Sequence, residues 1–189
     1  SFTLYMVNHA MLGLVMSGVA VRFVFPAVSL EGRAWWIVRT APVRLSQFLH
    51  AKLLIYFVPL ALMGLSLSWI SALVIGVPLA FAVISTGVVL SLALSVSAMG
   101  VGIGALFPRF TVENPAKIPT GIGGVSFMIS SMSFVLVFLL STVYPSFVLY
   151  HWPQRPHIGR PLWFWSSVVA VVVMAVLGTW LPMFLGHRK

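Results

Sequence analysis

The side chains that could perform acid–base, nucleophilic or metal chemistry are few. The chain of 189 residues contains 11 Lys and Arg, 5 His, 2 acidic residues and no Cys. The two acids are Glu31 and Glu113, and there is no Asp, so neither a pair of carboxylates for general acid–base catalysis nor a Ser-His-Asp triad is predicted within this chain. Disulfides and thiolate metal sites are excluded as well. These residues therefore do not predict an enzyme.

Histidine and glycine offer two further kinds of site. His9 has no second His, Cys or carboxylate at ligand spacing, so it predicts a hydrogen bond at the membrane interface or between helices. The phosphate-loop pattern Gly-x-x-x-x-Gly-Lys-Ser/Thr is absent. Gly100 and Gly104 lie one helical turn apart in an apolar stretch, which indicates close helix packing, with a path or hinge lined by small residues as the alternative. No metal or other cofactor is expected.

The elements that would position these residues are membrane spans. Hydrophobic residues make up 60% of the chain and charged residues 7%, whereas soluble domains carry about 25% charged residues. A bilayer requires about 20 apolar residues per helix. Uncharged runs of that length predict an all-α helical membrane bundle, a single transmembrane domain over 1–189, with spans at about 2–21, 53–75, 79–107, 122–148 and 163–185.

The distribution of basic residues predicts the orientation. Nine Lys and Arg fall between the first and second spans, between the third and fourth, and after the fifth, against Arg155 and Arg160 on the other side. The side with nine charges is expected to be cytoplasmic, and the C-terminus with it. This rule also accounts for the net charge of +9 without a nucleic-acid partner. Because an apolar sequence begins on the outer side without a charged leader, we expect at least one further span before residue 1.

The cytoplasmic segment 23–51 holds a second kind of helix. Ser29 to Arg39 predicts an amphipathic helix parallel to the membrane, with Ser29 as N-cap and Glu31 in the first turn. Leu30, Ala34 and Ile37 recur on one face of it. Two interpretations stay open: a surface helix that fills the space between spans, or a docking element for a soluble partner.

Two sequence motifs carry a resemblance to a known family. They are FPAVSLEGRAWWIVRTAPV from Phe25 to Val43 and LFPRFTVENP from Leu106 to Pro115. Together they resemble the permease subunits of bacterial ATP-binding cassette exporters, and in particular exporter permeases with a Phe-Pro-x-x-Ser-Leu-Glu-Gly-Arg segment and a Phe-Pro-Arg-Phe-x-x-Glu-Asn-Pro loop. The resemblance covers about Phe23 to Gly124.

The resemblance implies a permease in the bacterial plasma membrane that works by alternating access with a separate cytoplasmic ATPase. A short coupling helix after an early span would receive the movement of the ATPase, and Glu31 occupies the place of an acid that anchors this region. A second permease half or other membrane subunits would complete the transporter, since such permeases have at least six spans per half. The residues expected to contact the ATPase or to serve coupling are Glu31, Arg33, Arg39, Arg109 and Glu113.

A competing hypothesis is a structural subunit with a permease-like fold that does not transport. The absence of ionisable residues from every span favours it, and also argues against an ion channel or a proton-coupled carrier. An uncharged path would accept lipid-like or amphipathic cargo more readily than small ions. The substrate itself is not predicted.

Overall fold

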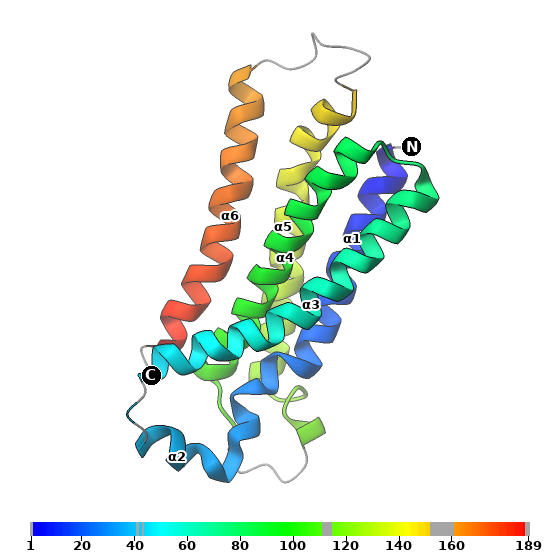
Figure 1. Ribbon diagram of the computed structural model, residues 1–189. Helices are drawn as coiled ribbons and strands as arrows, with labels where there is room; N and C mark the ends of the chain where they lie inside the picture. The colour runs from blue at the N-terminus through cyan, green and yellow to red at the C-terminus, as the bar shows by residue number, and fades with distance from the viewer. Residues whose placement is uncertain (1, 41, 43, 111–114, 152–160, 188–189) are drawn as a thin grey trace.

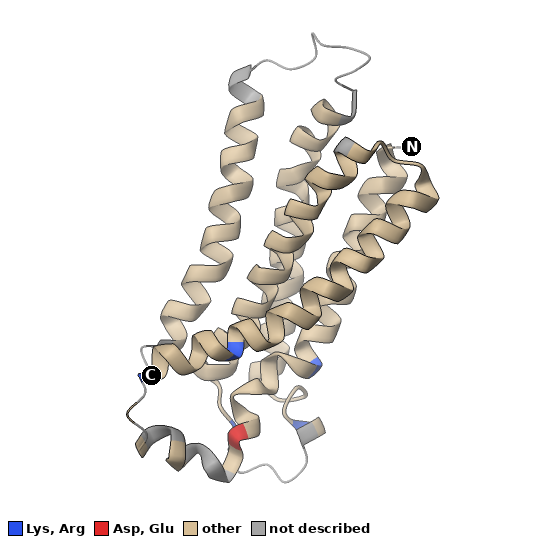
Figure 2. Ribbon diagram, viewed as in Figure 1, with Lys and Arg blue, Asp and Glu red and all other residues tan. Residues whose placement is uncertain are grey.

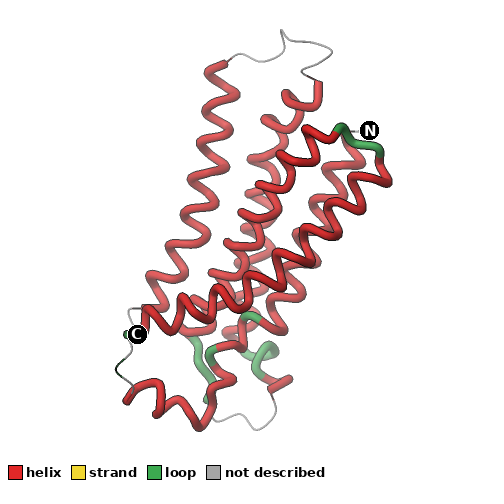
Figure 3. Tube along the Cα trace, viewed as in Figure 1, coloured by secondary structure: helices red, strands yellow, loops and turns green. Residues whose placement is uncertain are grey.

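The computed structural model describes residues 2–40, 42, 44–110, 115–151 and 161–187. Within these residues every regular element is a helix, and Figure 3 shows helices joined by short loops. The α-helices are α1 (Phe2–Phe23), α2 (Trp35–Thr40), α3 (Leu45–Ile75), α4 (Leu79–Leu106), α5 (Ile122–His151) and α6 (Pro161–His187). Three 3-10 helices lie between them: η1 (Phe25–Ala27), η2 (Ser29–Ala34) and η3 (Pro115–Lys117).

Five of these helices, namely α1, α3, α4, α5 and α6, are long and apolar enough to cross a membrane. They form an elongated bundle, with the N-terminus and the α3–α4 turn at one end and α2 at the other (Figure 1). The prediction of an all-helical chain with five such helices is therefore confirmed.

Helix α4 lies at the centre of the bundle. It packs against α1, α3, α5 and α6, and 56% of its most apolar window is buried, against 28% for α3 and 17% for α6. Its buried side chains Val89, Leu92 and Val96 belong to the same core as Met16 of α1 and Phe138 of α5. The outward faces of α3 and α6 are apolar and exposed, which is the arrangement that a surrounding bilayer stabilises.

The ends of α3 are set by local hydrogen bonds. At its start the backbone N–H of Arg44 donates to Oε1 of Gln47 at 3.1 Å, so the helix begins at Leu45, within the predicted cytoplasmic segment 23–51. At its end Gly76 has φ 73°, and the N–H of Val77 donates to the Ala72 carbonyl at 3.0 Å. Glycine tolerates this left-handed conformation because it has no Cβ, and the chain reverses into α4.

The predicted continuous helix from Ser29 to Arg39 is wrong. Gly32 has φ 49° and ψ −123°, so the helical path is interrupted by a kink inside η2, before α2 begins at Trp35. Ser29 is the first residue of η2 and not the N-cap before it, and its buried hydroxyl accepts a hydrogen bond from a distant backbone N–H. The predicted apolar face is divided between two short helices, with Leu30 before the kink and Ile37 after it.

Charged residues gather at the end of the bundle that holds α2 (Figure 2). Arg155 and Arg160, the two basic residues expected on the other side, lie outside the described residues. The basic residues whose side chains are described here are Arg22, Arg44, Lys52, Arg109 and Lys117.

Candidate functional site

The chain that leaves α1 runs under α4 as a buried connector, defined here as residues 24–29. All six of its residues are buried, including Pro26, Ala27 and Val28. The Phe25 ring stacks on Phe127 of α5, with centroids 5.8 Å apart. A buried segment of this kind cannot shift without displacing its neighbours, because protein interiors are packed at high density.

Gly100 and Gly104 of α4 lie directly against this connector. A Cβ added to Gly100 would lie 2.7 Å from Cγ1 of Val24, and one added to Gly104 would overlap the backbone carbonyl oxygen of Phe25. The two glycines that the sequence singled out therefore lie against the turn after α1, where only a bare backbone leaves enough room.

Ser29 joins the connector to the segment after α4. The backbone N–H of Arg109 donates to Ser29 Oγ at 3.0 Å, across 80 residues of sequence. The Arg109 guanidinium lies so close to Gly121 that a Cβ there would overlap it. Arg109 is thus engaged through its backbone in an internal contact, although its side chain is exposed.

Glu31, in η2, forms an ion pair with Lys52 of α3. The Lys52 ammonium also lies 5.5 Å from the centroid of the Phe48 ring, a cation–π distance. Both charged side chains are mostly shielded, with 25% of Glu31 and 19% of Lys52 exposed, so screening by solvent is weaker than for a surface pair. This pair ties the residues just before the Gly32 kink to a membrane-spanning helix.

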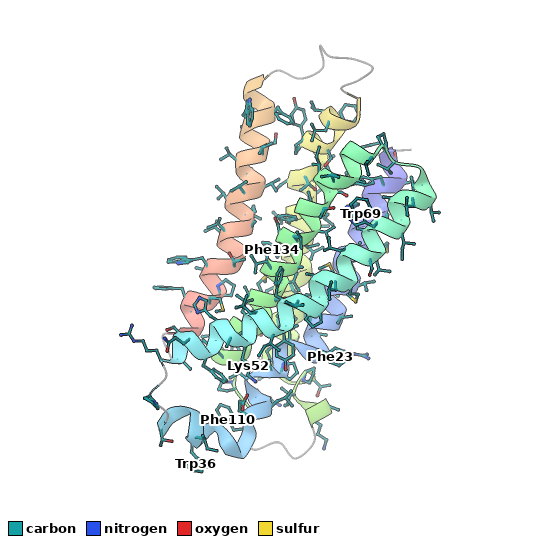
Figure 4. The ribbon with its side chains drawn as sticks, in the orientation of Figure 1. Phe23, Trp36, Lys52, Trp69, Phe110 and Phe134 are labelled. Atoms are coloured by element: carbon teal, nitrogen blue, oxygen red, sulfur yellow. The ribbon has the colours of Figure 1, made fainter. Side chains whose placement is uncertain are left out.

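Beyond the kink, α2 carries exposed apolar side chains. Trp36 is 64% exposed and points away from the bundle (Figure 4), and Ile37 is also exposed. The side chains of Arg33 and Arg39, and all of Glu113, lie outside the described residues. Of the five predicted coupling residues, the structure thus places Glu31 and Arg109 at one end of the bundle, each with an internal partner.

This end of the bundle is held together by packing contacts, a hydrogen bond and an ion pair. Among the described residues no three His, Cys, Asp or Glu side chains come together in a metal-binding group. Instead, residues 24–31 contact α3, α4, α5 and the segment after α4. These contacts hold residues 24–31 against three of the long helices.

A second feature is an apolar groove of about 330 Å³ between α1 and α5. It is lined by Ala10 and Leu14 from α1 and by residues 132, 133, 135, 136 and 139 from α5. Ser133 is the polar side chain among them. The groove lies midway along two helices that are long enough to span a bilayer, so hydrocarbon is the chemistry it would accept.

A family model described as "Putative ATP-binding cassette" matches residues 3–189 of this chain. The chain belongs to this family. No curated protein and no solved structure matches the sequence. The family's description mentions ATP binding, but the sequence of this chain contains no phosphate-loop pattern. The described residues also contain no strand that could precede such a loop.

The sequence did not predict which side chains contact residues 24–31. Lys52 was counted only as one of the positive charges that predict the cytoplasmic side. Glu31 lies 21 positions before it, and no local sequence pattern indicates that the two side chains meet. Phe127 gave no signal, since a Phe in an apolar span is ordinary. The expected hydrogen bond of His9 also differs, because its Nδ1 contacts the Tyr5 carbonyl of its own helix rather than another helix.

Proposed function

We propose that this chain is the membrane-spanning permease part of an ATP-driven exporter in a bacterial plasma membrane, and that ATP is hydrolysed by a separate cytoplasmic subunit. The observation that carries the proposal is the buried connector, which links the exposed helix α2 to several membrane helices. Family membership supplies the association with an ATP-binding cassette. The chain itself would perform no hydrolysis.

In this proposal α2 is the coupling element. The ATPase would bind the exposed surface formed by Trp36 and Ile37, and its movement would displace α2. Because residues 24–31 are held against three membrane helices, that displacement would change how the spans pack and so alternate the access of a central path. A second permease half, or other membrane subunits, would complete the path.

The proposed cargo is lipid-like or amphipathic. None of the five spans predicted from the sequence contains Asp, Glu, Lys or Arg, and ion or proton paths usually require such residues. The groove between α1 and α5 is apolar as well. Both features favour cargo that carries hydrocarbon.

Orientation can be tested by labelling single cysteines, since the chain has none of its own. We expect Leu79→Cys, at the exposed start of α4, to react with a membrane-impermeant maleimide in intact cells. Ser46→Cys, in the first turn of α3, should react only after the membrane is permeabilised. Reaction of Ser46→Cys in intact cells would show that the end holding α2 faces outward, where no cytoplasmic ATPase could reach it.

The function itself is tested by purifying the tagged chain from its native membrane in mild detergent. We expect a subunit with a phosphate loop to copurify, and its ATPase rate to rise when this chain is present in proteoliposomes. The double variant Trp36→Ala with Ile37→Ala tests the docking surface. This variant should still insert in the membrane, but less of the ATPase subunit should copurify with it. A stable membrane assembly without any ATPase would instead support a purely structural role.

A further inference from the structure

The His9 ring lies inside the bundle in the first third of α1. It is 5% exposed, and its Nδ1 is 3.1 Å from the backbone carbonyl oxygen of Tyr5, one turn earlier. A carbonyl oxygen can only accept a hydrogen bond, so Nδ1 must carry the proton of this contact. In the neutral imidazole the other nitrogen, Nε2, is then an unprotonated acceptor.

A neutral ring is expected at this position. The two acids of the chain, Glu31 and Glu113, both fall outside the apolar spans, and Glu31 pairs with Lys52 at the end that holds α2. A charged imidazolium buried without a counter-charge would lose its hydration and gain nothing in exchange. Because the ring is neutral and its one N–H is at Nδ1, facing the Tyr5 carbonyl, Nε2 can only accept a hydrogen bond.

Nε2 of His9 is buried, and none of the described residues supplies a donor to it. The hydroxyl of Ser85 in α4 donates to the Ala82 carbonyl at 2.7 Å, so its proton is engaged within α4.

The surroundings of the ring restrict what could approach it. The Tyr5 ring centroid is 4.1 Å from that of His9, and Phe81 of α4 lies 4.7 Å from Tyr5 on the same side of the bundle. These aromatic neighbours provide no anion to balance a cationic donor. A neutral group that carries an O–H is therefore the chemistry that satisfies Nε2 at the lowest cost, because buried polar atoms in native proteins almost always have a partner.

We propose that His9 Nε2 is the acceptor of a binding site, inside the bundle and beside the Tyr5 ring of α1, for a neutral hydroxyl donor. The donor is either a buried water molecule or the hydroxyl of an amphipathic molecule such as a lipid headgroup. The inference does not depend on the ATPase partner or on the proposed transport, so either can fail without the other.

The test is nitrogen NMR of the full chain, labelled with ¹⁵N histidine and reconstituted in two kinds of vesicle. Phosphatidylcholine vesicles offer water as the source of hydroxyl donors, because this lipid has neither O–H nor N–H. Vesicles that also contain phosphatidylglycerol offer headgroup hydroxyls. His9→Phe, which keeps the ring shape, identifies the His9 signals by their loss from the spectrum.

We expect a His9 signal with Nδ1 protonated and Nε2 unprotonated, the latter shifted in the direction that hydrogen bonding produces. A shift in both kinds of vesicle, with magnetisation transfer from water, identifies water as the donor. A shift that requires phosphatidylglycerol identifies a headgroup hydroxyl. An unshifted Nε2 in both, or a ring protonated at Nε2, would overturn the proposal.

Discussion

Replacing Gly104 with alanine should lower the melting temperature of the purified protein strongly. The added Cβ would overlap the carbonyl oxygen of Phe25, which belongs to the buried connector and cannot rotate away as a side chain could. Overpacking of a well-packed interior typically costs about 1–3 kcal/mol. We expect the upper part of that range, and a larger loss for Gly104→Leu. Thermal unfolding followed by circular dichroism in detergent measures the effect.

The matched control is Gly87→Ala in the same helix. Gly87 is exposed, and a Cβ there would meet nothing within 4 Å, so this variant adds the same methyl group without a contact. Alanine is also the better helix former by about 1 kcal/mol. The control should therefore unfold at the wild-type temperature or above it. Equal melting temperatures for Gly104→Ala and wild type would show that the connector does not lie against α4.

Exchanging the charges of Glu31 and Lys52 should separate two roles for Glu31. If the acid acts through its ion pair with Lys52, Glu31→Gln and Lys52→Gln should each weaken the coupling of ATP hydrolysis to transport. The reason is that Glu31, just after the connector, would lose its contact with α3. A shielded pair of this kind contributes about 1 kcal/mol, which corresponds to roughly a fivefold change in an equilibrium. The double exchange Glu31→Lys with Lys52→Glu should restore much of the loss.

The measurement is the ATPase rate per transported molecule in proteoliposomes, together with recovery of the ATPase on the tagged chain. Failure of the double exchange to restore coupling, with both single variants folded, would mean that Glu31 contacts the ATPase directly. Wild-type coupling in Glu31→Gln would remove this acid from the mechanism. Loss of folded protein from the membrane in both single variants would show that the pair acts only as internal scaffolding.

The positions of the long helices could be predicted because membrane spans are determined by composition over about 20 residues. The turn between α3 and α4 could also be predicted locally, because the sequence places a Gly and a Pro between two uncharged runs. The segment after α1 was harder to predict. Ser29 to Arg39 reads as a single amphipathic helix, whereas the structure has a kink at Gly32, which the periodicity of the apolar residues does not indicate.

By itself the sequence determined that this chain is helical and apolar, with its charges outside the spans and no phosphate loop, because these properties depend on residue type and short-range order. Only the tertiary structure decided that Glu31 pairs with Lys52 and that Ser29 accepts a hydrogen bond from the Arg109 N–H. The same holds for the contact between Gly104 and the backbone of Phe25. It also decided that His9 bonds within its own helix. The reason is physical: each of these choices depends on which helix faces meet, and side-chain periodicity alone does not specify that in a bundle apolar on nearly every face.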